Sequence, residues 1–193
     1  MKIPLRFQIT EFDCGTVTLQ NAISYLHERE NIPAEIVRAI SLYTLDCYDE
    51  KGNIGQGGTS KQAINMMTNW ITNYTNSHDF NLTANHYLNK NVTLEIIQKC
   101  INKKGCVVLR TYQDVEHYAL ITNIKDNKVY IWDPYYLEET YYNNDKNIEI
   151  IFDKPFDYNR IVDINRFLST THKDFALGPI NNRECLCFSL KNK

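Results

Sequence analysis

The sequence lacks the features that mark membrane, nucleic-acid-binding or secreted proteins. No window approaches the roughly 20 apolar residues that a membrane-spanning helix needs, and the segment after Lys2 is too polar for a secretory signal. Basic residues are not in excess, because the formal net charge of the 193 residues is −2. We therefore expect a soluble, cytoplasmic protein with no nucleic-acid partner and no membrane partner.

The cysteine pattern argues against disulfide bonds and against a zinc site. Six cysteines in a chain without a secretory signal favour free thiols over a disulfide framework. Cys185 and Cys187 have no second cysteine pair and no nearby histidine to complete four zinc ligands, so we expect no metal and no other cofactor. Four cysteines in apolar runs are predicted to be small core residues, namely Cys100, Cys106, Cys185 and Cys187.

Hydrophobic periodicity changes along the chain from helical to strand-like. The chain has 193 residues, of which 43% are hydrophobic, and this predicts a single domain over residues 1–193. Helices followed by antiparallel strands predict an α+β fold. The predicted helices are 14–26, 33–43, 60–71, 94–101 and 163–168, and the predicted strands are 106–110, 117–124, 128–133, 148–152 and 185–190, with a further strand near 80–84.

A cysteine stands where the first helix is expected to begin. Cys14 is followed by Gly15, and the residues after it carry one apolar stripe at helical spacing. A helix N-terminus favours negative charge and lowers the pKa of a thiol. Gly15 would let a substrate backbone approach the helix start. Cys14 is therefore a candidate thiolate nucleophile.

His117 is the best candidate for a base that activates this thiol, because it opens an apolar, strand-like run. Asp133 ends the next predicted strand and would orient the imidazole if both side chains share one face of the hairpin. A two-residue turn at 126–127 would put Asp133 on the opposite face. A three-residue loop at 125–127, or an equivalent bulge, would put it diagonal to His117. The other histidines occupy weaker positions: His27, His78, His86 and His172.

Gln8 is the candidate oxyanion donor. It precedes Cys14 by six residues, and its amide would act together with the backbone N–H of Cys14. Each candidate alone has a commoner structural explanation, such as an inert core cysteine, a half-buried strand histidine or an Asp-Pro turn. Their joint occurrence, in the order Gln, Cys, His, Asp with a helix before a hairpin, favours catalysis.

A polar, glycine-bearing loop at 46–58 precedes the third predicted helix. The loop ends in Gly57 and Gly58, and Thr59 with Gln62 has the pattern of a capping box. We expect Gly57, Gly58 and Thr59 to line the substrate cleft, because glycine lets a substrate backbone come close.

These motifs resemble the papain-like cysteine peptidases that cleave double-glycine leaders from bacteriocin precursors. The resemblance implies a papain-like α+β fold, with a helical N-terminal part and the nucleophile at a helix start packed on an antiparallel sheet. It also implies a Cys14 nucleophile, a His117 base, an Asp133 orienter and a Gln8 oxyanion donor. The matching motifs are Gln8-x-x-x-x-Asp13-Cys14-Gly15, Gly58-Thr59-Ser60, His117-Tyr118 and the run 129–134 that ends in Asp133-Pro134.

The resemblance covers about residues 8–134 and has limits. We expect no transmembrane exporter fused to these residues, so the resemblance does not imply a role in secretion. Residues 152–193 have no counterpart in it, and we expect them to form a C-terminal extension that completes the domain.

Three functional hypotheses follow. The first is a cysteine-dependent hydrolase of a peptide or amide substrate. The second is a papain-like acyltransferase of natural-product biosynthesis, in which an amine resolves the thioester. The third is a non-catalytic peptide-binding domain, which predicts an ordinary thiol pKa near 8.5 for Cys14. The sequence leaves the substrate and the oligomeric state open.

Overall fold

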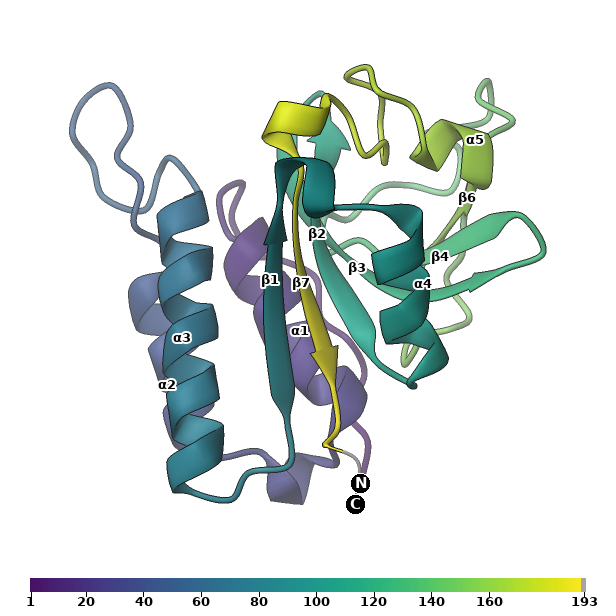
Figure 1. Cartoon of the computed structure of the whole chain (residues 1–193). Helices are drawn as coiled ribbons and strands as arrows, with labels where there is room; N and C mark the ends of the chain where they lie inside the picture. The colour runs from purple at the N-terminus through teal and green to yellow at the C-terminus, as the bar shows by residue number, and fades with distance from the viewer. Residues whose placement is uncertain (192–193) are drawn as a thin grey trace.

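In the computed structural model, which describes residues 1–191, one antiparallel sheet of seven strands lies between two groups of helices (Figure 1). The predicted α+β class is confirmed. The helices are α1 (Cys14–Leu26), α2 (Ala34–Tyr43), α3 (Lys61–Ser77), α4 (Leu94–Asn102) and α5 (Ile164–Phe167), with 3-10 turns at Arg29–Asn31, Asn89–Asn91 and Ile180–Asn182. The strands are β1 (Thr83–Leu88), β2 (Cys106–Gln113), β3 (Val115–Lys125), β4 (Lys128–Trp132), β5 (Ile148–Ile150), β6 (Arg160–Asp163) and β7 (Glu184–Ser189).

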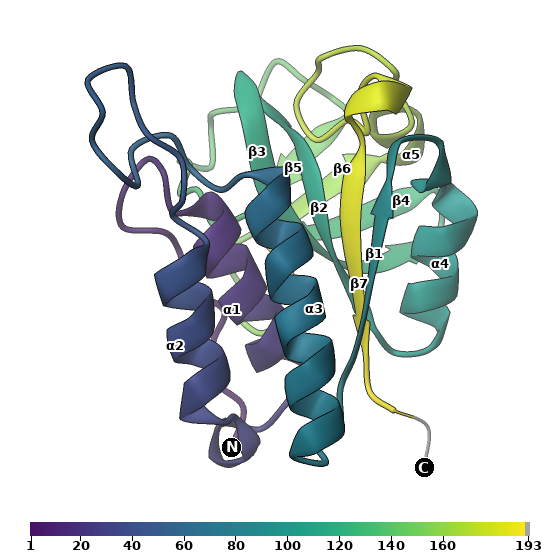
Figure 2. The same ribbon diagram turned by 60° about the vertical axis from the view of Figure 1, so that its left-hand side comes forward.

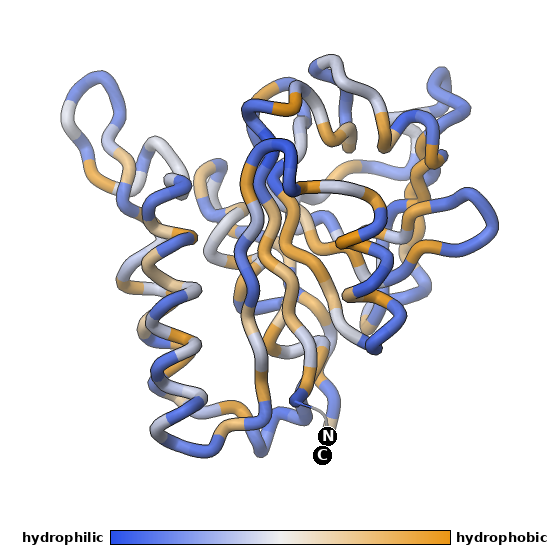
Figure 3. The backbone as a smooth tube through the Cα atoms, viewed as in Figure 1, coloured by the Kyte–Doolittle hydropathy of each residue, from blue (hydrophilic) through white to orange (hydrophobic). Residues whose placement is uncertain are grey.

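The sheet has a core on each face. The helices α1, α2 and α3 lie together on one side and α4 on the other (Figures 1 and 2). Successive side chains of a strand point to opposite faces, so Val108 and Leu120 join the α1–α3 core, whereas Val107 and Ala119 join the α4 core. Apolar residues are concentrated along the central strands, and the loop between α2 and α3 is polar (Figure 3).

The C-terminal part of the chain is built into this sheet. The strand order is β1-β7-β2-β3-β4-β6-β5, so the last strand lies between β1 and β2. The predicted strand at 185–190 is observed at Glu184–Ser189 and the one near 80–84 at Thr83–Leu88. The strand β6 was not predicted, and the helix expected at 163–168 is one turn with Asp163 as its N-cap.

The β3–β4 hairpin meets the condition on which the candidate triad depends. Its turn has two residues, Asp126 and Asn127, both with positive φ as a type I′ turn requires. A bulge at Thr122 then shifts the register by one, and Leu120 pairs with Trp132. Continuing this register places Asp133 opposite Ala119 and therefore diagonal to His117. The predicted alternative of an equivalent bulge is confirmed.

One predicted helix cap was wrong by one residue. The N-cap of α3 is Ser60, whose hydroxyl accepts a hydrogen bond from the N–H of Ala63 at 3.0 Å. The Thr59 hydroxyl instead donates to the carbonyl of Thr44 at 2.5 Å. Both residues have hydroxyls suited to capping, and the contact with the end of α2 decides between them.

All six cysteines lie within the described residues, and each is a free thiol. The four that were predicted to be core residues are buried, as expected. Within residues 1–191, none of the helices is long and apolar enough to cross a bilayer.

Candidate active site

Cys14 is the first residue of α1 and borders two cavities. Its side chain is 8% exposed and touches the α1–α3 core. The larger cavity, of about 730 Å³, is also lined by the loop before α3 and by Tyr118. The smaller one, of about 290 Å³, is also lined by His117 and Tyr135. The thiol is therefore not sealed inside the core, because both cavities reach it.

The surroundings of Cys14 favour a thiolate. Burial raises the pKa of the thiol, but a hydrogen bond and the positive charge of His117 outweigh burial and lower that pKa below its ordinary value. The backbone N–H groups of Tyr118 and Gly15 act in the same direction. The helix start contributes as well, because unpaired N–H groups favour an anion there.

His117 lies between the thiol and a buried carboxylate. Its Nε2 atom is 2.7 Å from Oδ1 of Asp133, and the Asp133 side chain is 0% exposed. Burial opposes the charged imidazole, but Asp133 and Cys14 together raise the pKa of His117 to about 10. Because the carboxylate of Asp133 engages Nε2, the other ring nitrogen, Nδ1, remains available to the Cys14 thiol.

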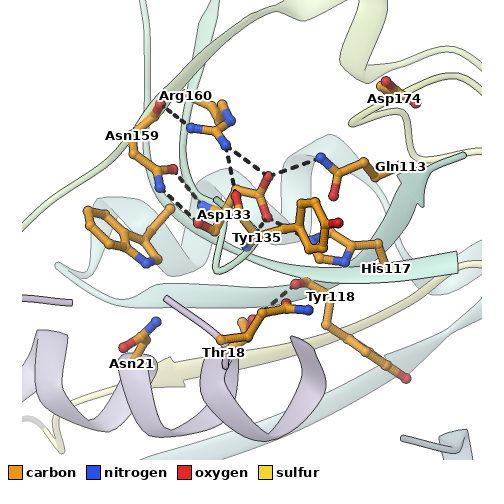
Figure 4. A network of polar contacts seen from close by, with 12 residues as sticks. Thr18, Asn21, Gln113, His117, Tyr118, Asp133, Tyr135, Asn159, Arg160 and Asp174 are labelled. Carbon is orange, nitrogen blue, oxygen red and sulfur yellow. Dashed lines mark hydrogen bonds and ion pairs between the residues drawn. The ribbon is translucent and has the colours of Figure 1, made fainter. Parts of the chain in front are cut away.

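Asp133 is held by residues that sequence analysis did not single out (Figure 4). The N–H of Tyr135 donates to Oδ1 at 2.9 Å. The amide of Gln113 donates to Oδ2 at 3.5 Å, and Nη2 of Arg160 lies 3.4 Å from the same oxygen. The side chain of Asn159 pairs with both the N–H and the C=O of Asp133, at 2.7 and 2.8 Å.

No local pattern identifies Asn159 and Arg160. They occupy the end of a polar segment and the first position of β6, and only the pairing of β6 with β4 brings them beside Asp133. Gln113 ends β2 and reaches Asp133 across the sheet.

Gln8 lies beside this network. Its N–H donates to the carbonyl of Pro134 at 2.8 Å, directly after Asp133. Its side-chain Nε2 donates to the carbonyl of Thr10 at 2.9 Å. An amide nitrogen carries two N–H groups, so this contact leaves one for another acceptor.

The residues Gly57, Gly58 and Thr59 line the larger cavity together with Cys14. The contact between Thr59 and the start of α1 is close. A Cβ atom on Gly15 would lie 2.3 Å from Oγ1 and 2.6 Å from Cβ of Thr59. Glycine at position 15 is therefore required by packing as well as being suited to a substrate's approach.

The other histidines have different environments. His27 is buried and stacks on Phe80, with ring centroids 4.5 Å apart. His86 pairs with buried Glu184 at 2.7 Å, and the hydroxyl of Tyr118 donates to the other oxygen of that carboxylate at 2.6 Å. His78 stacks on Tyr74 and His172 on Tyr112. All five histidines lie within residues 1–191, and His117 is the one that contacts the Cys14 thiol.

Solved structures that match this chain include the following three. A double-glycine-motif protease from an AMS/PCAT transporter, solved with its leader peptide, has 12% identity and a TM-score of 0.46, with 100% of this chain and 93% of that chain covered. The peptidase domain of Streptococcus ComA, a bifunctional ABC transporter of a quorum-sensing pathway, has 14% identity and a TM-score of 0.48, with 98% of each chain covered. A Bacillus anthracis protein described as a C39-like peptidase has 13% identity and a TM-score of 0.49, with 99% of this chain and 96% of that chain covered.

Comparison with curated proteins gives no match. Comparison with protein families gives a match over residues 1–162, which extends beyond the motifs noted in the sequence and includes Arg160 and most of β6. The fold agrees with the expected papain-like α+β class, since a helix that begins at a cysteine packs on an antiparallel sheet of seven strands. The chain belongs to the Peptidase_C39 like family.

Proposed function

We propose that the protein is a papain-like cysteine peptidase in which Cys14, His117 and Asp133 form the catalytic triad. The observation that carries this proposal is the buried contact of 2.7 Å between His117 and Asp133, with the Cys14 thiol on the other side of the imidazole. Membership of the Peptidase_C39 like family supports it.

The proposed reaction has two stages. The Cys14 thiolate attacks the scissile carbonyl while His117, protonated on both ring nitrogens, lies beside it. The resulting oxyanion accepts hydrogen bonds from the Cys14 N–H and the Gln8 amide. His117 then gives its Nδ1 proton to the leaving amine, and an acyl-enzyme forms. Water, deprotonated by His117, attacks the thioester and frees Cys14.

The two cavities suggest how a peptide would lie. The leaving amine must meet the His117 proton, and His117 borders the smaller cavity. The leaving side of the substrate is therefore assigned to the smaller cavity. The acyl side is assigned to the larger cavity, where Gly57 and Gly58 present no side chains and Thr59 forms the wall next to Gly15.

The test uses the thiol and a matched control. Purified protein is incubated with peptides encoded near its own gene, and products are identified by mass spectrometry. Cys14→Ala should abolish cleavage, whereas Cys187→Ala should leave it unchanged, because Cys187 lies in β7 and borders neither cavity. Cleavage that survives Cys14→Ala would refute the proposal.

Two further measurements test the role of Gln8 as oxyanion donor and identify the acceptor of the acyl group. Removing one oxyanion donor from a serine hydrolase lowers kcat by about 10²–10³-fold, so Gln8→Ala should lose activity on that scale with little change in KM. Adding a primary amine to the reaction distinguishes hydrolysis from acyl transfer. If water resolves the acyl-enzyme, the product is the free acid, and if the amine resolves it, the product is the amide.

A further inference from the structure

A wholly buried arginine lies behind the Asp133 carboxylate. Arg160 is 0% exposed, and its Nη2 atom is 3.4 Å from Oδ2 of Asp133. The guanidinium also donates to two carbonyl oxygens, from Nη1 to Asn159 and from Nη2 to Tyr135, each at 2.9 Å. Figure 4 shows Asp133 between Arg160 and His117.

The neighbouring residue fixes the backbone of Asp133. Asn159 accepts from the N–H of Asp133 at 2.7 Å and donates to its carbonyl at 2.8 Å. The N–H of Asn159 itself donates to the carbonyl of Ile131 at 2.9 Å, which continues the pairing of β6 with β4. Backbone and carboxylate of Asp133 are thus held by two consecutive residues of one segment.

Packing alone does not explain an arginine at position 160. Burying a guanidinium is unfavourable unless it is paired, and apolar residues of similar volume commonly replace buried ion pairs without loss of stability. Arg160 remains incompletely satisfied, since its Nε atom has no hydrogen-bond partner within residues 1–191. A role for its positive charge is the better explanation.

We propose that Arg160 is a positioning residue for the proposed peptidase: its guanidinium balances the buried charge of Asp133 and holds that carboxylate against His117, which keeps Cys14 as a thiolate. This inference rests on the proposed function, because it assigns Arg160 a role through the same three side chains.

The charges explain why Arg160 affects the thiol. The thiolate, the imidazolium, the carboxylate and the guanidinium sum to zero in a site that is almost fully buried. Without the guanidinium, a net negative charge would remain there. Protonation of Cys14 is then the simplest compensation, since burial already disfavours the thiolate.

Other titratable groups around Asp133 and Arg160 are few. Tyr135 and Tyr142, from the segment after β4, lie near Asp133, and both have pKa values raised above the ordinary value, so they stay neutral. Glu11 faces Tyr135, and Asp174 accepts from the hydroxyl of Tyr142 at 2.8 Å. Gln113 is neutral. Arg160 is thus the cation that contacts Asp133 from the side opposite His117.

The experiment follows alkylation of Cys14 by iodoacetamide across pH, resolved by peptide mass spectrometry, so no substrate is needed. Arg160→Met should shift the acid limb of the Cys14 profile upward by about one pH unit, which is a tenfold lower rate at mildly acidic pH. Arg160→Lys, which retains the charge, should recover most of the rate. Arg166→Met is the matched control, because Arg166 pairs with Asp145 at 2.5 Å, away from His117.

Buried cysteines report whether each variant is folded. Cys100 and Cys106 should stay unreactive in native conditions. A folded Arg160→Met with the wild-type profile overturns the proposal. If Arg160→Met exposes Cys106, Arg160→Gln replaces it, since the amide keeps polar contacts without charge, and a wild-type profile there also overturns it. If both variants expose Cys106, Arg160 serves folding and the proposal is overturned.

The same data separate this inference from the proposed function. A wild-type Cys14 with an ordinary thiol pKa near 8.5 counts against the peptidase proposal itself. If Cys14 is reactive in the wild type and its alkylation profile is unchanged in Arg160→Met, the result counts only against the role of Arg160.

Discussion

The contact between Gly15 and Thr59 joins the nucleophile's helix to the loop that lines the larger cavity. We predict that Gly15→Ala destabilises the protein and displaces Cys14. The new Cβ would lie 2.6 Å from Cβ of Thr59, so turning the Thr59 side chain cannot relieve the overlap. The hydroxyl of Thr59 is also held by the carbonyl of Thr44 at 2.5 Å.

The size of the effect follows from these distances. Carbon atoms pack best about 3.5–4.0 Å apart, so the helix start and the loop must separate by about 1 Å. Overpacking of this kind costs about 1–3 kcal/mol, and Tm falls by about 2–4 °C for each kcal/mol in a protein of this size. A 1 Å displacement of a reacting group also lowers catalysis by about 10²-fold.

A double-mutant cycle tests the cause. Thr59→Gly removes the clashing atoms, and alone it loses the bond to Thr44, at about 1 kcal/mol, with about 0.5–1 kcal/mol more for glycine flexibility. The double variant, Gly15→Ala with Thr59→Gly, should be nearly as stable as Thr59→Gly, with a coupling of about 1 kcal/mol or more. Urea denaturation measures stability, and alkylation at mildly acidic pH reports Cys14.

If the losses of stability of the two single variants simply add in the double variant, the reasoning is refuted. Additivity would mean that the methyl group introduced by Gly15→Ala is accommodated without contact with Thr59. Recovery of stability without recovery of Cys14 reactivity would refute the second step, in which displacement of the helix start causes the functional loss.

Two further predictions concern pH. The rate of peptide cleavage should have a bell-shaped pH dependence, rising as Cys14 loses its proton at a pKa below the ordinary thiol value and falling as His117 loses its proton near pH 10. A single acid limb in stopped-flow assays would contradict the ion pair. Burial lowers the pKa of His27 to about 4, so the unfolded chain, with a histidine pKa near 6.5, binds more protons between these values and stability falls as pH drops through them. His27→Phe should remove this loss, as measured by urea denaturation at pH 7 and pH 4.5, and an equal loss in both proteins would contradict it.

Local sequence signals were sufficient for the elements that carry the proposed triad. The helix after Asp13 and the hairpin from His117 to Trp132 follow from apolar spacing and an Asp-Asn turn, and both are observed. The register was not determined in advance, because the two-residue turn alone predicts Asp133 on the wrong face. A bulge at Thr122 corrects it, and no residue near Thr122 signals a bulge.

The residues around Asp133 were beyond sequence reasoning for a different reason. Turns, bends and the short strand β5 separate Asp133 from Arg160 along the chain, and the pairing of a four-residue strand, β6, brings the two together. So short a strand gives little periodic signal. The N-cap of α3 was misassigned for a similar reason, since a tertiary contact with Thr44 draws Thr59 away from the helix start.

The structure also suggests why the nucleophile and the base keep one geometry. The hydroxyl of Thr18 donates to the carbonyl of Tyr118 at 3.0 Å, so α1 is tied to β3 one residue after His117. Side chains of α1 and β3 share a buried core, which makes this a rigid contact between two elements. An aspartate in the orienting position strengthens the imidazolium more than a neutral amide would, but it is stable when buried only beside a cation. The pairing of Asp133 with Arg160 supplies that cation within the same sheet, so the base, the orienting carboxylate and its cation come from three neighbouring strands, β3, β4 and β6, while α1 supplies the thiol.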